Sequence, residues 1–161
     1  MVDAYASNVR RYLYRRLMGS SDPASTADDL TADVIVIAWR RRGDVPSGAE
    51  LPWLYAVARR VLANHRRRSQ DVLVADLGEL DAIDEADPGE IVTDNAALGD
   101  AWRAISPRDR EVLRLVAWEG LSGAQLATAL GISEGGAAAA LSRARSRFVE
   151  SLAGVQGTPT G

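Results

Sequence analysis

Three helix starts are encoded in close succession between residues 106 and 134, and they restrict the fold more than any other feature of the sequence. Ser106-Pro107 is an N-cap followed by a first-turn proline. Ser122-Gly-Ala-Gln125 has the spacing of a capping box, and Gly131-Ile-Ser133 is a tight turn whose serine can cap the next helix. Two short helices joined by such a turn predict a helix-turn-helix, whose second helix enters a DNA major groove. A plain helical hairpin in a bundle is the less favoured alternative.

The remaining apolar residues also recur at helical spacing, which predicts an all-α protein. Residues 4–18 form one amphipathic helix, a second starts near Thr26 and runs to 42, and a third covers Trp53 to His65 after a loop at 43–52. The segment 34–37 has strand propensity, but its apolar residues on more than one face favour a helix covered by two partners. The apolar stripe of the last helix consists of Ala137, Leu141, Ala144, Phe148 and Leu152.

Charge is distributed in three blocks along the chain. Residues 1–70 hold 12 arginines and 7 acids, residues 71–100 hold 10 acids and no basic residue, and residues 101–161 hold 7 arginines and 5 acids. This pattern predicts two small helical domains, an N-terminal helical bundle (1–70) and a C-terminal helix-turn-helix domain (99–154), joined by an acidic flexible linker (71–98). Residues 155–161 are expected to be a disordered tail. On charge alone, an ordinary chain with one acidic loop is equally compatible.

Several functional classes are excluded by composition. The chain has no cysteine and one histidine, which argues against a disulfide scaffold, a zinc finger and a cysteine nucleophile. No apolar run approaches the roughly 18 residues of a membrane span, and the N-terminus lacks a signal pattern. No phosphate loop or nucleophile motif is present, so an enzyme is the weakest hypothesis. We therefore expect a cytoplasmic, non-enzymatic protein with no cofactor, metal, small-molecule substrate or membrane insertion.

Arginines are concentrated at the end of the third predicted helix. Five of them lie within ten residues, at Arg59, Arg60, Arg66, Arg67 and Arg68. Cations in a last helical turn stabilise the helix dipole. Because five exceed what a helix end requires, a site for a polyanion is the favoured interpretation.

From about residue 5 to 152, the chain resembles bacterial RNA polymerase sigma factors of the extracytoplasmic-function (ECF) class. Three stretches carry the resemblance: Thr26-Ala-Asp-Asp-Leu30 leading to Ala38-Trp-Arg40; Trp53-Leu-Tyr-Ala-Val-Ala-Arg59 leading to Asn64-His-Arg-Arg67; and Ser106-Pro-Arg-Asp-Arg-Glu-Val-Leu113 through Glu119-Gly-Leu-Ser122 to Gly131-Ile-Ser133 and Arg143-Ala-Arg145. Each stretch alone is moderately specific, and their order and spacing make the match strong.

The resemblance implies binding to core RNA polymerase and to promoter DNA, as the duplex −35 element and the melted −10 element. The core polymerase would contact Asp28, Asp29, Asp33, Trp39 and Arg40. The −10 element would contact Ser47, Trp53, Tyr55, Arg59, Arg60, Asn64, His65, Arg66, Arg67 and Arg68. Trp53 and Tyr55 would be base-stacking platforms beside a basic rail, although Trp53 is at least as readily interpreted as a core aromatic. The −35 element would contact Ser122, Gln125, Ser133, Glu134, Ala138, Ser142, Arg143, Arg145 and Arg147.

Two further expectations follow from the resemblance. The acidic linker would thread polymerase channels that otherwise hold nucleic acid, the alternative being a solvated tether, and an anti-sigma factor is an expected partner. The last helix departs from the family pattern because Glu134-Gly-Gly-Ala-Ala-Ala-Ala140 replaces the usual polar and basic residues. Since arginine pairing with guanine is missing there, we predict weak or shape-based reading of the −35 element. Ala32, where glutamine is usual, puts one further contact in doubt.

Two non-enzymatic alternatives remain. A stand-alone helix-turn-helix regulator would bind palindromic duplex DNA without polymerase. A sigma-like module that only binds polymerase or an anti-sigma factor, with weakened −35 reading, is suggested by the alanine run.

Overall fold

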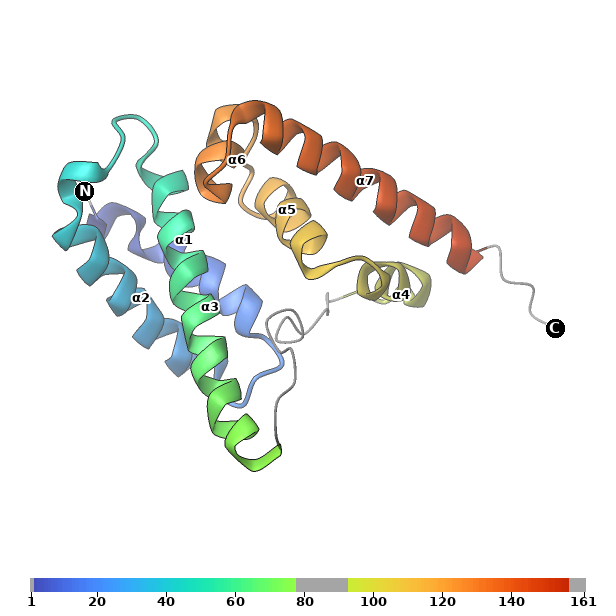
Figure 1. Cartoon of the computed structure of the whole chain (residues 1–161), viewed down its shortest axis with the longest axis horizontal. Helices are drawn as coiled ribbons and strands as arrows, with labels where there is room; N and C mark the ends of the chain where they lie inside the picture. The colour runs from blue at the N-terminus through green and yellow to red at the C-terminus, as the bar shows by residue number, and fades with distance from the viewer. Residues whose placement is uncertain (1, 78–92, 157–161) are drawn as a thin grey trace. The chain divides into compact units, whose positions relative to one another are not determined.

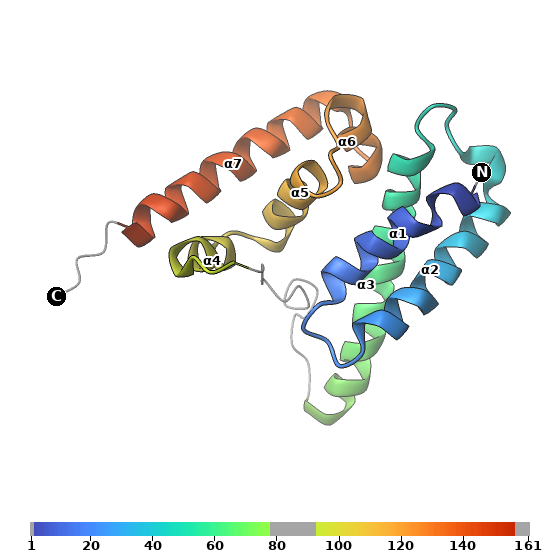
Figure 2. The ribbon, with the colours of Figure 1, turned by 180° about the vertical axis from the view of Figure 1, so that it is seen from behind.

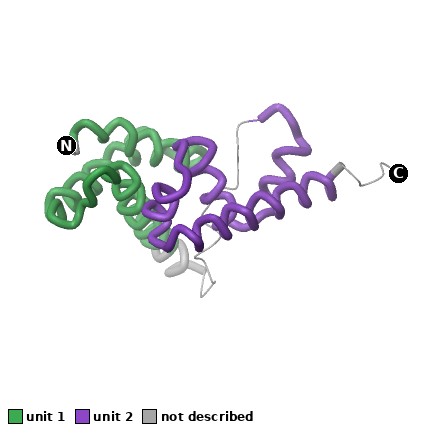
Figure 3. Tube along the Cα trace, turned by 90° about the horizontal axis from the view of Figure 1, so that it is seen from above, with its two compact units in different colours: residues 1–88 green, residues 89–161 purple. Residues whose placement is uncertain are grey.

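The structure, a computed structural model, describes residues 2–77 and 93–156. Within these residues it has seven α-helices, one short 3-10 helix and no strand (Figures 1 and 2), which confirms the predicted all-α class. The chain divides into two compact units, residues 1–88 and residues 89–161 (Figure 3). Within the described residues, no helix is both long enough and apolar enough to cross a membrane.

The first unit contains three helices that pack against one another: α1 (Val2–Leu17), α2 (Pro23–Arg40) and α3 (Glu50–Leu77). The predicted apolar stripes form its core, which includes Val9, Leu13, Leu17, Leu30, Val34, Ala38, Leu54, Val57, Ala58, Val61 and Leu62. The segment of strand propensity at 34–37 lies within α2. Burial between two neighbouring helices therefore outweighs local propensity there, as predicted.

The boundaries of α2 and α3 differ from those predicted. Helix α2 begins at Pro23 rather than near Thr26, because Asp22 is its N-cap and accepts a hydrogen bond from the Ser25 N–H at 3.2 Å. Proline at the first helical position has no N–H to satisfy, so it suits this start. Helix α3 begins at Glu50, which shortens the predicted loop at 43–52, and the 3-10 helix η1 (Arg42–Asp44) lies within the segment before it.

The second unit contains α4 (Ala96–Ala104), α5 (Pro107–Ala117), α6 (Gly123–Leu130) and α7 (Glu134–Gln156). Helix α7 packs against the other three. Its small residues Ala140 and Ala144 allow close approach to Val112 of α5, and Leu113, Leu130 and Leu141 surround this cluster. Near the other end of α7, Phe148 meets Trp102 of α4 edge to face, with ring centres 5.9 Å apart.

The segment predicted as a linker, 71–98, is too long at both ends. Helix α3 continues past the predicted end at His65 to Leu77, and α4, which sequence analysis missed, begins at Ala96. Helix α4 is stabilised by an Asn95 N-cap that accepts from the Leu98 N–H at 3.2 Å and by burial of Trp102. Residues 78–92 lie outside the described part. At the C-terminus, α7 extends to Gln156, and the remainder of the predicted tail is also outside it.

Candidate polymerase and nucleic-acid interfaces

Helix α2 has one face that none of the described residues of the first unit covers. All five residues predicted to contact polymerase, Asp28, Asp29, Asp33, Trp39 and Arg40, are exposed on this helix. Asp29, Asp33, Val36 and Arg40 recur at helical spacing and therefore form a continuous stripe that is acidic at one end and basic at the other.

The flanks of this stripe are ordered by contacts with arginines. Asp28 pairs with Arg10 of α1 at 2.5 Å. Trp39, of which 65% is exposed, lies under the guanidinium of Arg42, whose carbon is 4.7 Å from the ring centre. Arg42 also donates to the Trp39 carbonyl oxygen at 2.9 Å. A large exposed aromatic beside charged groups is typical of a protein–protein interface.

Two residues predicted to contact the −10 element, Tyr55 and Arg66, make contacts within the fold. Tyr55 is only 3% exposed, and its ring stacks on Tyr12 with centres 5.2 Å apart, so it is not available as a platform for a base. Arg66 donates to the backbone carbonyl oxygen of Arg16 at 3.0 Å and ties α3 to α1. Helical spacing places Tyr55 on the face of α3 that already carries Leu54 and Ala58, so its burial could have been expected.

Three arginines and one asparagine form a polar rail on the outer face of α3. Arg60, Asn64, Arg67 and Arg68 are exposed and recur one or two helical turns apart. Arg67 donates a hydrogen bond to the Asn64 side-chain oxygen. Arg59 and His65 are half-buried beside this face. Sequence analysis therefore named more candidate residues for contact with the −10 element than the exposed rail contains.

The loop between α2 and α3 is held by side-chain contacts at both ends. The Glu50 carboxylate accepts from the Gly48 N–H at 2.9 Å, and this hydrogen bond, with one from the N–H of Glu50 itself, lowers the carboxyl pKa. Gly48 has φ +80°, where a side chain would be strained. Ser47 is exposed in this loop, whereas Trp53 of α3 is half-buried, with the Arg41 guanidinium carbon 5.7 Å from its ring centre. The loop therefore has defined geometry.

Helices α6 and α7 form the predicted helix-turn-helix. Gly131, with φ 68°, ends α6 in the left-handed region, and its N–H donates to the Thr128 carbonyl at 3.2 Å. Ser133 caps α7 by accepting from the Gly136 N–H at 3.0 Å, as predicted. The capping box at Ser122 is not formed. Ser122 occupies the N-cap position, but its side chain makes no cap hydrogen bond, and its backbone carbonyl accepts from the Gln125 N–H at 3.1 Å instead.

The outward face of α7 is nearly free of long side chains in its first two turns. Between Glu134 and Arg145, the exposed residues of α7 are Glu134, Gly135, Ala138, Ala139, Ser142, Arg143 and Arg145. Ser122, Gln125 and Ser133 are also exposed. The two adjacent glycines differ: a Cβ at Gly135 would meet no atom within 4 Å, whereas one at Gly136 would lie 3.1 Å from the capping Ser133 oxygen. Gly136 is therefore constrained by the helix cap, and Gly135 is an open position.

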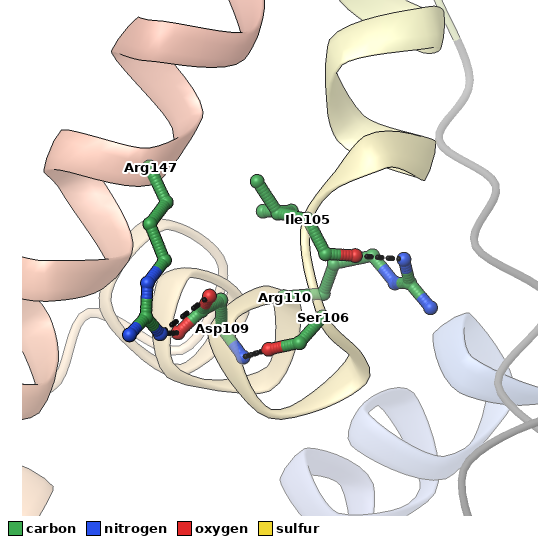
Figure 4. Close-up of polar contacts among 5 residues, drawn as sticks. All are labelled: Ile105, Ser106, Asp109, Arg110 and Arg147. Atoms are coloured by element: carbon green, nitrogen blue, oxygen red, sulfur yellow. Dashed lines mark hydrogen bonds and ion pairs between the residues drawn. The ribbon is translucent and has the colours of Figure 1, made fainter.

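Arg147, predicted to contact DNA, is committed in part to the fold. Its Nη1 atom lies 3.1 Å from both carboxylate oxygens of Asp109, whose side chain is 7% exposed, as Figure 4 shows. Asp109 occupies the third position of α5, and its own N–H donates to the Ser106 hydroxyl at 3.1 Å. The pair therefore fixes α7 against the start of α5.

Arg110 is a structural residue that sequence analysis did not single out. Its buried guanidinium donates to the carbonyl oxygen of Ile105 at 2.6 Å (Figure 4). It also donates to the carbonyl oxygens of Trp102 and Arg103 at 3.4 Å. These carbonyls end α4, so the positive charge also suits the helix dipole. The sequence offered one signal of this role, an arginine in the first turn of a helix that starts with Ser-Pro.

Comparisons with known proteins agree with these two units. The family model described as "Sigma-70 region 2" matches residues 1–72, and that described as "Sigma-70, region 4" matches residues 96–148. The chain is 37% identical over 142 residues to the ECF RNA polymerase sigma factor BldN of Streptomyces coelicolor, and 30% identical over 141 residues to the ECF RNA polymerase sigma factor SigL of Mycobacterium tuberculosis. Each match covers 84% of this chain.

A solved structure shares the fold. The sigma factor RpoE of Bartonella quintana, crystallised with the anti-sigma factor NepR, matches with a TM-score of 0.61 and 23% identity over 93% of this chain and 95% of that chain. The chain therefore belongs to the sigma-70 family of RNA polymerase sigma factors, and within that family to the ECF class. The chain spans about half the length of BldN (52%) and 77% of SigL.

Proposed function

We propose that this chain is an ECF-type sigma factor that binds core RNA polymerase and directs promoter recognition, −10 melting and transcription initiation. The supporting observation is that one chain carries, in order, a helical unit matched by sigma-70 region 2 and a helix-turn-helix unit matched by region 4. Promoter opening requires both a site that binds duplex DNA and a surface that binds unpaired bases. In this proposal the chain itself catalyses no reaction. It acts in the cytoplasm, together with polymerase and DNA.

The exposed stripe of α2 is our candidate for the polymerase contact. Asp29, Asp33 and Arg40 supply charges of both signs around Val36, and Trp39 supplies a large aromatic surface. Aromatic anchors account for much of the binding energy at interfaces. Asp28 contributes less in this proposal because Arg10 already pairs with it.

The α3 rail is our candidate for the melted −10 strand. Arg60, Arg67 and Arg68 would contact successive phosphates, with Asn64 between them, and Ser47 and Trp53 would lie toward the bases. Arg59 and His65 are secondary candidates because they are half-buried.

The helix-turn-helix is our candidate for the −35 duplex. Arg143 and Arg145 suit phosphates, and Glu134 and Ser142 are the polar groups of α7 that could reach base edges beside the methyl group of Ala138. Ser122, Gln125 and Ser133 are candidates for further backbone contacts. Because hydrogen-bonding groups are few, we propose that this element is read weakly.

An anti-sigma factor is a proposed further partner, since the related Bartonella sigma factor was crystallised with one. A linker that enters polymerase channels also remains a proposal, because residues 78–92 lie outside the described part.

Run-off transcription with and without core polymerase tests the proposal. We expect the chain alone to bind promoter duplex poorly and the reconstituted holoenzyme to initiate at a defined position. Strong sequence-specific binding by the chain alone would instead indicate a stand-alone regulator. Binding to core polymerase without initiation at any promoter in a randomised library would indicate a polymerase-binding module, the second candidate, which the bare face at Gly135, Ala138 and Ala139 favours.

A further inference from the structure

The first two turns of α7 offer methyl groups to a bound duplex and no hydrogen-bond donor. Residues 134–141 consist of one glutamate, two glycines, four alanines and one leucine, and none of these side chains can donate a hydrogen bond. Two of the four alanines are buried in the core, so the exposed methyl groups are those of Ala138 and Ala139. The glycine at position 135 is also exposed and adds no side chain that would keep the helix away from base edges.

An arginine borders this face on each side. Arg143 and Arg145 are both exposed, and two residues along an α-helix correspond to a rotation of about 200°, so they lie on opposite flanks. Ala139 lies one turn before Arg143 on one flank, and Ala138 lies two turns before Arg145 on the other. A helix in the major groove has one phosphate backbone on each side. Each arginine therefore suits the phosphates of one strand, and each alanine suits the bases of that strand.

This set of groups discriminates between bases in the major groove. Guanine presents only acceptors there, N7 and O6, which need a donor that residues 134–141 lack. Thymine is the base that presents a methyl group, and apolar side chains such as alanine contact it. Burial of one methyl group raises affinity about fourfold. Two such contacts produce a modest preference, which agrees with the weak reading proposed above.

We infer that Ala138 and Ala139 are specificity-determining residues that select thymine in the −35 element, through contact with one 5-methyl group on each strand. The inference rests on the proposed function, in which α7 meets the −35 duplex, and it names the chemistry by which this chain recognises that duplex.

The test uses the full chain assembled with core polymerase, and a promoter duplex that this holoenzyme selects from a library randomised across the −35 element. We expect the selected duplex to carry thymine on both strands. Each thymine is then replaced in turn by uracil, which lacks only the 5-methyl group. Binding by the wild type should weaken about fourfold at two thymines, one on each strand. In Ala138→Gly one of these two losses should disappear and the other should persist.

Two further variants serve as controls. Ala153→Gly places the same substitution at an exposed position in the last turns of α7, so it has a comparable cost in helix propensity. It should respond to each uracil as the wild type does. Arg145→Ala should weaken binding to every duplex alike and reduce the salt dependence of binding, as the loss of a phosphate contact predicts.

Other outcomes would refute the inference. Selected duplexes without thymine, or uracil substitutions that leave wild-type binding unchanged, would contradict it directly. Equal losses in the wild type and Ala138→Gly at every thymine would mean that the methyl groups act through DNA shape. Weakened binding of Ala138→Gly to core polymerase itself would mean that this face contacts protein. A holoenzyme that initiates transcription but enriches no −35 sequence would refute the inference alone, whereas one that initiates at no promoter would refute the proposed function as well.

Discussion

The ion pair between Asp109 and Arg147 leads to an asymmetric prediction for stability. Asp109 is 7% exposed in its side chain and Arg147 is 55% exposed. Arg147→Ala leaves a buried carboxylate without its cation, which costs 3–5 kcal/mol when both partners are fully buried. Because water can reach the carboxylate from the exposed Arg147 side, we expect Arg147→Ala to lower stability by about 2 kcal/mol. Asp109→Ala leaves Arg147 unpaired, but this side chain is already mostly solvated. We therefore expect a loss of about 1 kcal/mol in stability, from the ion pair and from the interaction of Asp109 with the helix dipole.

Amide hydrogen exchange followed by mass spectrometry measures this effect in the full chain, because local opening free energies are read peptide by peptide. Exchange in α5 and α7 should accelerate roughly thirtyfold in Arg147→Ala and about fivefold in Asp109→Ala, since 1.4 kcal/mol corresponds to a factor of ten. Peptides from α1 to α3 are the internal control and should not change. A larger effect for Asp109→Ala than for Arg147→Ala would refute the reasoning, because the buried charge would then not be the costly group.

Three other substitutions or conditions give separate expectations. Gly135→Ala should stabilise α7 by up to about 1 kcal/mol, because alanine favours the helix and its Cβ meets no other atom. Gly136→Ala should be neutral or destabilising, because its new Cβ crowds the Ser133 helix cap. Thermal unfolding of the two variants measures both effects. The hydrogen bond from the Gly48 N–H lowers the folded-state pKa of Glu50 below its ordinary value of 4.5, so this bond is complete at neutral pH and is lost as pH falls through the lowered pKa. The Gly48 amide NMR shift should therefore titrate in acid at a pH below 4.5, and a midpoint above 4.5 would contradict the reasoning. Urea unfolding should show that Tyr55→Ala destabilises the first unit by about 3–5 kcal/mol, because a buried ring is lost, and that Tyr55→Phe destabilises it much less. Equal effects of the two substitutions would mean that the hydroxyl, rather than the buried ring, is important.

Sequence patterns predicted the regular parts of the molecule because burial follows helical spacing. The stripes of α1, α2, α3 and α7 contribute to the cores of their units, and the predicted caps at Ser106 and Ser133 form. Helix α4 was missed because it is only nine residues long and follows an acidic segment. Short helices of this kind depend on tertiary contacts, here burial of Trp102, more than on local propensity.

The candidate interfaces were predictable by residue type and less so by role. The acids and Trp39 of α2 are exposed, and their contact with polymerase stays a prediction. Tyr55 and Arg66 were assigned to DNA because aromatic and basic residues suit nucleic acid, but residue type does not reveal which side chains the fold itself uses.

The contacts of Arg110 determine how the second unit can be excised for separate study. Since this side chain binds the carbonyls at the end of α4, a fragment cut at Pro107 would leave a guanidinium that is buried in the intact chain without its acceptors and would discard Trp102. A cut at residue 99, the sequence-based boundary, would remove the Asn95 cap and the first turn of α4. The shortest autonomous version should therefore start no later than Thr93, whose hydroxyl accepts from the Asn95 N–H.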